Sequence, residues 1–422
     1  MMSIKFVDLA AQNQEIQHHV ESEFAHLHRD ASYVGGPQVA AFEAEFASYL
    51  GVKRVIGVGS GTDALRLTLL AMGIGAGDEV ITSAMTFIAT AAAIFQTGAR
   101  PVFVEVDREN GNMNARALRH YLESRRWSAP NGPRAILPVH LYGMPAPIHD
   151  LQAIADEFDL RIVEDACQAH GARICRPDGW VMMGTVGAAG CFSFYPGKNL
   201  GAWGDAGAVV TNDEELAARV TLLRDHGRIS HYAHEEFGYN SRLDAMQAIV
   251  LRAKLSRLDD WNMRRRNIAD AYRNLLSGCE VELPFEPEGA ESCYHLFVIR
   301  SKKRDLIRKA LLQNRIECGI HYPVPLHLQP ACHMLGYRPG DLPISEQMAD
   351  TVLSLPLHPH LSPRDVARTA ATVRRALESK PETLDDELKE DRKSACGLLL
   401  CVRSLVAVQE KCSPTKSESR KR

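Results

Sequence analysis

The feature that most limits the possible folds of this chain is the alternation of apolar strands with helices in its first half. Strand candidates lie at residues 54–58, 79–82, 101–106, 134–139 and 160–163, and helical segments separate them. Parallel strands need crossover connections of this kind, which place helices on both faces of the sheet. We therefore predict an α/β fold with a mostly parallel sheet and with ligands at the carboxyl ends of its strands.

A glycine-rich turn follows the first of these strands. Gly59-Ser60-Gly61-Thr62 leads from the strand into a helical segment at 65–72. Free N–H groups and the positive end of a helix bind anions at such a turn, most naturally a phosphate. The turn also matches the loose dinucleotide fingerprint, which leaves a nicotinamide-dependent dehydrogenase as an alternative. However, no carboxylate ends the next strand, where that fold needs one to hold a ribose.

A single lysine follows the strand predicted at 191–195. Pro196-Gly197 breaks this strand and leaves Lys198 at the mouth of the sheet, before a further strand at 208–211. A lysine in this position can form a Schiff base with an aldehyde cofactor or a carbonyl substrate. On this stretch alone, an exposed loop lysine is the simpler interpretation.

Other candidate side chains also stand just after strands. Asp165 either caps the next helix or serves a ligand, and Gln168 and His170 beyond it are by themselves ordinary loop residues. Phe87 either packs in the core or stacks on a flat cofactor ring.

Taken in their order along the chain, these groups match the requirements of a single cofactor. Pyridoxal phosphate (PLP) needs an anion-binding turn, a carboxylate that keeps its pyridine nitrogen protonated, and a lysine that holds its aldehyde and moves a proton. The turn at Gly61, then Asp165, then Lys198 supply these three parts. The ordered set predicts a PLP-dependent enzyme.

Composition narrows the partners and the cellular context. The chain has 422 residues and a formal charge of −3, and its apolar run at 397–402 is too short to span a membrane, so we expect neither nucleic acid nor membrane as a partner. Ten cysteines without a C-x-x-C pair or zinc-type spacing favour reduced thiols and no metal site. The N-terminus lacks the apolar core of a signal peptide, so we expect a cytoplasmic protein.

The second half of the chain predicts a smaller domain and a tail. A long helix is expected at 245–257, and the basic stretch at 264–266 is expected on a solvated helix face. We place the N-terminal segment and the large PLP-binding domain at 1–245. The linking helix and a small α+β domain follow at 246–380, and a poorly ordered tail at 381–422.

Six motifs stand along the chain in a characteristic order: Gly61-Thr62-Asp63-Ala64-Leu65, Thr86-Phe87, Glu164 to Gly171, Ser193 to Leu200, Asn240-Ser241-Arg242-Leu243-Asp244, and His321-Tyr322-Pro323. This set, over roughly residues 4–376, resembles the DegT/DnrJ/StrS nucleotide-sugar aminotransferases. That family has the fold-type I architecture of aspartate aminotransferase, with a mixed, mostly parallel sheet in the large domain.

The resemblance implies roles at the cofactor. Lys198 would form the Schiff base, and Asp165 would pair with the pyridinium. Gln168 would lie near the ring hydroxyl, and Phe87 would stack on the ring face. The phosphate would be bound by Gly61, Thr62 and Ser193.

The resemblance also implies a partner subunit and a substrate region. Asn240 would reach the phosphate of the neighbouring subunit, so a homodimer with shared sites is expected. Arg242, His321 and Tyr322 match positions near the sugar and the amino donor.

Within the family, residues 193–205 and His140-Leu141-Tyr142-Gly143 look most like enzymes that aminate C3 of a dTDP-3-keto-6-deoxyhexose, which gives a dTDP-3-amino-3,6-dideoxyhexose. The resemblance implies that L-glutamate gives up its amino group first and that the keto-sugar then receives it. Alternatives are a UDP-linked 3-keto uronic acid, whose carboxylate Arg242 would bind, a 4-keto sugar, or a non-enzymatic regulator on the same fold. A related branch that dehydrates sugars has histidine in place of the lysine, and Lys198 argues against it.

Overall fold

A computed structural model describes residues 3–378 of the chain. The tail predicted at 381–422 lies outside the described residues. The described residues up to Leu377 pack as one compact unit.

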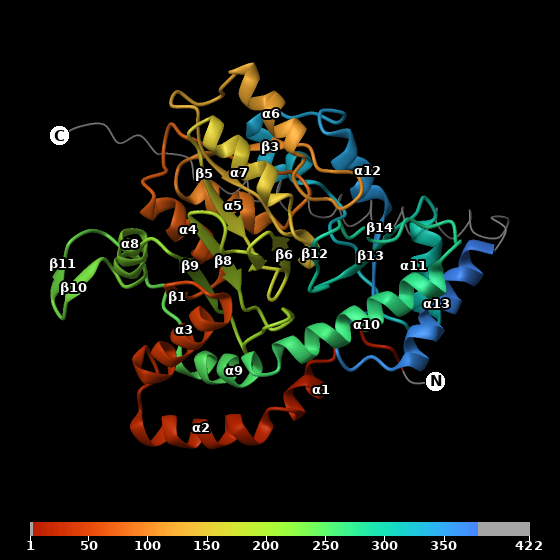
Figure 1. The fold of residues 1–422 in the computed structure, drawn as a ribbon, viewed down its shortest axis with the longest axis horizontal. Helices are drawn as coiled ribbons and strands as arrows, with labels where there is room; N and C mark the ends of the chain where they lie inside the picture. Colours follow the sequence, from red (N-terminus) through yellow and green to blue (C-terminus); the bar gives the residue numbers. More distant parts are fainter. Residues whose placement is uncertain (1–2, 379–422) are drawn as a thin grey trace, which may run out of the picture. The chain divides into compact units, whose positions relative to one another are not determined.

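A seven-stranded sheet forms the centre of this unit (Figure 1). Its strands are β1 (Arg54–Val58), β2 (Glu79–Ser83), β3 (Arg100–Val104), β4 (Pro133–Leu137), β5 (Arg161–Asp165), β8 (Ala189–Ser193) and β9 (Gly207–Thr211). They lie in the order β1-β9-β8-β5-β4-β2-β3. β9 runs antiparallel to both of its neighbours, whereas the pairs from β8 to β3 are parallel. The predicted α/β fold with a mixed, mostly parallel sheet is confirmed.

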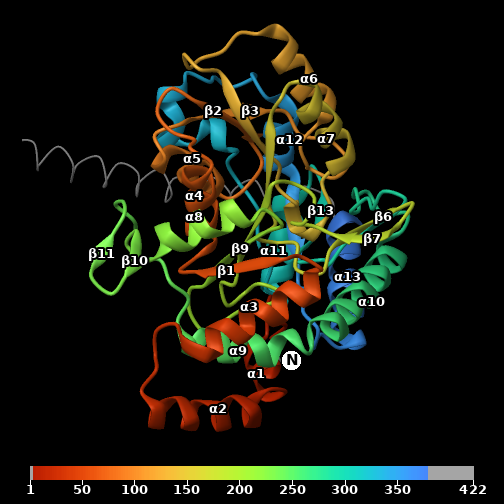
Figure 2. The same ribbon diagram turned by 60° about the vertical axis from the view of Figure 1, so that its left-hand side comes forward.

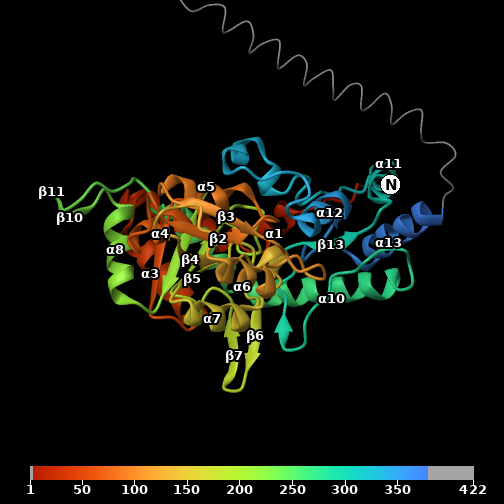
Figure 3. The same cartoon turned by 90° about the horizontal axis from the view of Figure 1, so that it is seen from above.

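Helices cover both faces of the sheet because side chains alternate between its faces along each strand. In β4, Ala135 and Leu137 belong to one buried cluster and Ile136 to another. The first cluster includes α4 (Gly61–Ala71), α5 (Ile88–Gln96) and α8 (Glu214–Arg224). The second includes α3 (Gly36–Leu50), α6 (Ala115–Ser124) and α7 (Ile148–Glu157). Figure 3 shows α5 and the pair α6–α7 on opposite sides of the strands.

The parallel strands bring four chain segments to one edge of the sheet. Since β2, β4, β5 and β8 run in the same direction, their carboxyl ends meet there. Asp165 is the last residue of β5, and Ser193 is the last residue of β8. Two predicted site residues are thus placed at the same edge by topology alone.

Two N-terminal helices pack on the helices that follow the large sheet. α1 (Leu9–Gln14) and α2 (Gln17–Asp30) lie beside α9 (Ala245–Leu255) and α10 (Leu258–Leu276), as Figure 2 shows for α2 and α9. Val20 and Leu27 of α2 share a buried cluster with Ile249 and Trp261.

The C-terminal part has a hydrophobic cluster of its own, in which Tyr272 of α10 packs with Phe297 and Leu353. Its elements are β13 (Phe297–Arg300), α11 (Arg304–Gln313), α12 (Pro343–Thr351), β14 (Val352–Leu355) and α13 (Pro363–Glu378). The separate cluster is compatible with the division proposed at residue 245, which stays a proposal.

Short elements surround these two parts. They are the three-stranded sheet of β6 (Arg173–Arg176), β7 (Gly179–Met182) and β12 (Ala290–Glu291), the hairpin of β10 (Arg228–Ser230) and β11 (Ala233–His234), and the 3-10 turns η1 (Leu141–Gly143), η2 (Leu326–Leu328) and η3 (Pro330–Leu335).

One expectation about the basic stretch is wrong. Arg264 and Arg266 are part-exposed and form ion pairs with carboxylates, as on a solvated face. Arg265 between them is buried, with only 3% of its surface exposed. Successive residues of a helix point about 100° apart, so one arginine of three turns inward.

Candidate active site

A cavity of about 520 Å³ opens at the carboxyl edge of the sheet. Its wall includes nine of the eleven residues predicted for the site: Gly61, Thr62, Phe87, Asp165, Gln168, Ser193, Lys198, His321 and Tyr322. Asn240 and Arg242 are not part of this wall. Residues far apart in the sequence therefore converge on one site.

A narrow cradle lies at the N-terminus of α4. The side chain of Ser60 caps the helix by accepting a hydrogen bond from the N–H of Asp63 at 3.1 Å. A Cβ atom on Gly61 would lie 2.6 Å from Cβ of Ser193 and 2.9 Å from Sγ of Cys167. Since only glycine fits, the helix N-terminus stays close to the Ser193 side chain, an arrangement that suits a phosphate.

Asp165 offers a buried carboxylate to the cavity. Its Oδ2 accepts a hydrogen bond from Oγ1 of Thr90 at 2.8 Å, and its Oδ1 accepts one from the N–H of Cys167 at 3.2 Å. The side chain is 5% exposed, and none of the described arginine, lysine or histidine side chains forms an ion pair with it. A buried carboxylate without a protein cation fits a cationic pyridinium.

Lys198 lies on the loop after β8, where its N–H donates to the carbonyl of Tyr195 at 2.8 Å. Burial lowers the pKa of its amine, and the neighbouring Asp165 carboxylate opposes this shift. A lowered pKa leaves more of the amine neutral and nucleophilic near pH 7, which Schiff-base chemistry requires. The exposed-loop interpretation of this lysine is therefore wrong.

The aromatic and amide groups of the cavity are held by a short hydrogen-bonded chain. Nε2 of Gln168 donates to the hydroxyl of Tyr322 at 3.1 Å, and Oε1 of Gln168 accepts from the N–H of Tyr142 at 2.7 Å. The hydroxyl of Tyr142 donates to the carbonyl of His321. The Phe87 ring is 53% exposed and lies 5.9 Å from that of Tyr322, so Phe87 is not a core residue.

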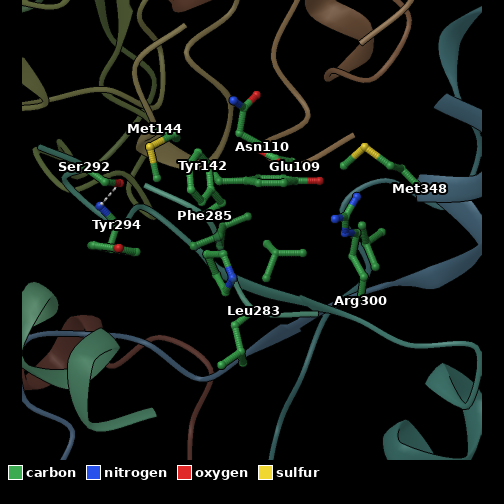
Figure 4. A pocket seen from close by; sticks show the side chains of 14 residues that line it. Glu109, Asn110, Tyr142, Met144, Leu283, Phe285, Ser292, Tyr294, Arg300 and Met348 are labelled. Atoms are coloured by element: carbon green, nitrogen blue, oxygen red, sulfur yellow. Dashed lines mark hydrogen bonds between the residues drawn. The ribbon is translucent and has the colours of Figure 1, made fainter. Parts of the chain in front are cut away.

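Tyr142 also belongs to a second, much smaller cavity of about 40 Å³ (Figure 4). It lines this cavity together with Asn110, Met348 and Arg300. Its side chain is buried; its main-chain N–H holds Gln168, and its hydroxyl holds the main chain of His321.

Two histidines near the site are held neutral. Burial, together with the charge of Lys198, lowers the pKa of His321 to about 4 and that of His170 to about 3. His321 also pairs through Nδ1 with Oγ of Ser354 at 2.8 Å. His170 is packed against Phe192 and Phe194 and does not line the cavity.

The two remaining predicted residues lie elsewhere in the described chain. Asn240 is exposed, close to the hairpin of β10 and β11. Nη1 of Arg242 forms an ion pair with Oδ1 of Asp225 at 3.0 Å. Their predicted roles toward a second subunit stay predictions.

The polar residues of the cavity wall that sequence reasoning missed include Thr90, Arg265 and His295. Thr90 stands one helical turn after Thr86, and this spacing is a usable signal once Thr86-Phe87 is recognised. Arg265 carried no signal, because its neighbours in the sequence are ordinary surface arginines.

Known proteins match this chain over most of its length. The model of the DegT/DnrJ/EryC1/StrS aminotransferase family matches residues 14–374. A dTDP-3-amino-3,4,6-trideoxy-alpha-D-glucose transaminase of Streptomyces venezuelae is 43% identical over 372 residues, which cover 88% of this chain and 95% of that protein.

A second relative and a solved structure agree with this. A UDP-N-acetyl-3-dehydro-alpha-D-glucosamine 3-aminotransferase of Acidithiobacillus ferrooxidans is 42% identical over 376 residues, which cover 89% of this chain and 98% of that protein. The crystal structure of DesV from S. venezuelae is similar with a TM-score of 0.85 and 42% identity, covering 90% of this chain and 100% of DesV.

Together, the matches and the site define a PLP-dependent sugar aminotransferase of fold-type I. The chain belongs to the DegT/DnrJ/EryC1/StrS aminotransferase family. The resemblance seen in the sequence motifs is confirmed, whereas the individual residue roles remain predictions.

Proposed function

We propose that this enzyme transfers the amino group of L-glutamate to C3 of a dTDP-3-keto-6-deoxyhexose, which gives a dTDP-3-amino-3,6-dideoxyhexose. The observation that carries the proposal is the convergence of the Gly61 cradle, the buried Asp165 carboxylate and the Lys198 amine on one cavity. The transaminase of S. venezuelae, which is named for a dTDP-3-amino sugar, supports the choice of sugar.

The residues of the cavity fit PLP, which when bound supplies an electron sink for the carbon that carries the amino group. The N–H groups at Gly61 and Thr62, with the Ser193 hydroxyl, would hold its phosphate. Asp165 would keep its ring nitrogen protonated, and Nζ of Lys198 would move the proton between carbon atoms.

The side chains around the ring would orient it. Phe87 would cover one ring face, because its exposed side chain lines the cavity. Gln168, already fixed by Tyr142, would approach the ring hydroxyl. His321 and Tyr322 would form the wall next to the sugar, where neutral His321 adds no charge.

The alternative substrates are less well supported by the described residues. The relative from A. ferrooxidans is named for a UDP-linked 3-keto sugar, so a UDP-sugar stays the second candidate. For a uronic acid, the arginine predicted to bind its carboxylate, Arg242, is already paired with Asp225 in this chain. A 4-keto sugar has no specific observation in its favour. A non-enzymatic regulator would have no use for the lysine and carboxylate kept here.

We further propose that the enzyme is a homodimer with shared sites. In the segment from β10 to Gly238, the large apolar side chains of Ile229, Tyr232 and Phe237 are 61%, 89% and 102% exposed. Exposed apolar groups of this size mark protein–protein interfaces. Asn240 follows these residues closely in the sequence. If they pack against a second subunit, Asn240 would lie near that subunit. A cytoplasmic location is proposed as well, and no helix among residues 3–378 is long and apolar enough to cross a membrane.

The first test is an absorbance spectrum of the purified protein in the near-ultraviolet and visible range. A cofactor band that L-glutamate shifts would support the cofactor, the donor and the first half of the reaction. No band after soaking with PLP would refute the proposal. Comparing turnover of a dTDP-3-keto-6-deoxyhexose with that of UDP-linked 3-keto sugars, a 3-keto uronic acid among them, then decides between these substrates.

The second test is the Lys198→Ala variant, with Lys53→Ala as its control, because Lys53 lies exposed before β1. We expect Lys198→Ala to lose turnover while some cofactor still binds, and Lys53→Ala to behave as the parent protein. Near-normal turnover of Lys198→Ala would exclude the proposed role of this lysine.

A further inference from the structure

Arg265 is a buried cation in the wall of the cavity that also contains Lys198. It stands on α10, which runs from α9 toward the C-terminal part (Figure 1). Its surface is 3% exposed, and it shares the cavity wall with His295 and Leu296.

The guanidinium of Arg265 is only partly satisfied. Its hydrogen bonds to the described residues all come from Nη1, which donates to the carbonyls of Tyr294 at 3.2 Å, His295 at 3.4 Å and Leu357 at 3.0 Å. Nε is buried without a hydrogen-bond partner among residues 3–378. The edge formed by Nε and Nη2 is therefore left free.

No carboxylate of the described residues forms an ion pair with Arg265, in contrast to its neighbours. Arg264 pairs with Asp260 and Glu15, and Arg266 pairs with Glu291. The part-exposed arginines thus have counter-charges, and the buried arginine has none. This is the reverse of the usual arrangement, because a charge out of water needs a partner more than one in water.

Arg265 remains a cation despite this environment. Burial lowers its pKa to about 10, which still leaves it protonated near pH 7. The cavity wall also contains the carboxylates of Asp165 and Asp205, and neither forms an ion pair or a hydrogen bond with Arg265. A ligand with a negative group would complete the site.

We propose that Arg265 binds a carboxylate of the amino-acid donor; this rests on the proposed function. The free Nε–Nη2 edge matches the two oxygens of one carboxylate, a geometry that gives strong paired hydrogen bonds. The keto-sugar carries no carboxylate, so Arg265 acts in the half of the cycle that uses the amino acid. The same cavity thereby accepts two unlike substrates in turn.

The probe is glutarate, a five-carbon dicarboxylate without an amino group, titrated into the cofactor-loaded protein in a calorimeter. Arg265→Gln removes the charge, and Arg265→Lys keeps the charge but lacks the paired edge. Arg266→Gln is the matched control on the same helix. We expect both Arg265 variants to bind glutarate about 10- to 100-fold more weakly, and Arg266→Gln to bind as the parent does.

Half-reactions separate a donor subsite from a purely structural role. In the Arg265 variants, kcat/KM for L-glutamate should fall by a similar factor, whereas dTDP affinity should stay within about twofold. The rate from the preloaded pyridoxamine phosphate form to the keto-sugar should also change little. If Arg265→Gln does not fold, the same measurements on Arg265→Lys test the proposal.

Two results would overturn the proposal. One is unchanged glutarate affinity and unchanged kcat/KM for L-glutamate in a folded Arg265→Lys protein. The other is an equal loss for dTDP and the keto-sugar, which would make Arg265 a structural residue or a phosphate ligand. Failure of the proposed function looks different, because the parent protein itself would then show no cofactor band and no amination.

Discussion

Replacing Glu164 by glutamine tests how the edge of the sheet that carries Asp165 is held in place. Glu164 precedes Asp165 in β5, and its carboxylate is fully buried. Oε1 accepts the N–H groups of Val186 and Gly187, each at 2.7 Å. Oε2 accepts the N–H of Gly184 at 2.8 Å and Nε2 of His140 at 2.9 Å. The carboxylate thus ties β5 to the segment that leads into β8.

The magnitude follows from counting donors. A glutamine keeps one oxygen and turns an NH₂ group toward two of the four donors. His140 cannot relieve this by changing its tautomer, because its Nδ1 already accepts the N–H of Ala146 at 3.0 Å. Each orphaned buried donor costs about 1–3 kcal/mol, so we expect a loss of about 2–6 kcal/mol in the free energy of unfolding.

The pH dependence has a defined sign. Burial alone raises the pKa of Glu164, but the hydrogen bonds from His140 and the main chain outweigh it and hold the pKa below 4.5. A lowered pKa in the folded state means that the charged side chain stabilises the protein above the unfolded-state pKa. This stability disappears as the pH falls through the folded-state pKa. The variant should therefore lose less stability in acid than the parent.

The assay is denaturant unfolding of the cofactor-loaded protein, followed by circular dichroism at neutral and acid pH. Glu157→Gln is the control, because Glu157 is exposed and makes a surface ion pair with Arg119. A difference between Glu164→Gln and Glu157→Gln below about 0.5 kcal/mol, the usual range of surface changes, would refute the reasoning.

Three further predictions concern the cavity. Gly61→Ala places a Cβ atom 2.6 Å from that of Ser193, so PLP affinity should fall at least about tenfold in equilibrium dialysis, whereas Gly75→Ala should leave it unchanged. Thr90→Val removes the donor 2.8 Å from Asp165 and should lower kcat about tenfold, and Thr90→Ser should restore most of it; equal rates for all three proteins would contradict this role. His321 has a pKa near 4 and stays neutral at higher pH, so His321→Gln should not remove any step in the pH–rate profile between pH 6 and 8.

The sequence predicted the residues whose role follows from a position on a parallel sheet. Asp165 and Lys198 were found because a polar residue at the end of an apolar strand reaches the ligand edge in this fold class. The start of α4 was placed four residues too late, at Leu65 instead of Gly61, because glycine weighs against helix in propensity. Ser60 followed by Asp63 three residues later was the signal that marked the true start.

The positions of other residues depend on contacts between segments that are distant in the sequence, and no local sequence pattern predicts them. Arg265 belongs to the cavity because α10 packs against the loops that carry Tyr294 and Leu357. Neither the turn of the helix toward those loops nor the lack of a counter-charge is visible in three consecutive arginines. The buried pair of His140 and Glu164 escaped for the same reason, since 24 residues separate the two side chains.

The cradle at Gly61 and the opposite wall of the cavity are built in different ways, which bears on how such a site changes during evolution. The cradle depends on the absence of a side chain at Gly61, where any Cβ atom would clash with Ser193 and Cys167. The wall at Phe6, His321 and Tyr322 consists of side chains on connecting segments outside the large sheet. Descendants of one ancestral enzyme can therefore exchange sugars by altering a few loop positions while the chemistry of the lysine is inherited unchanged.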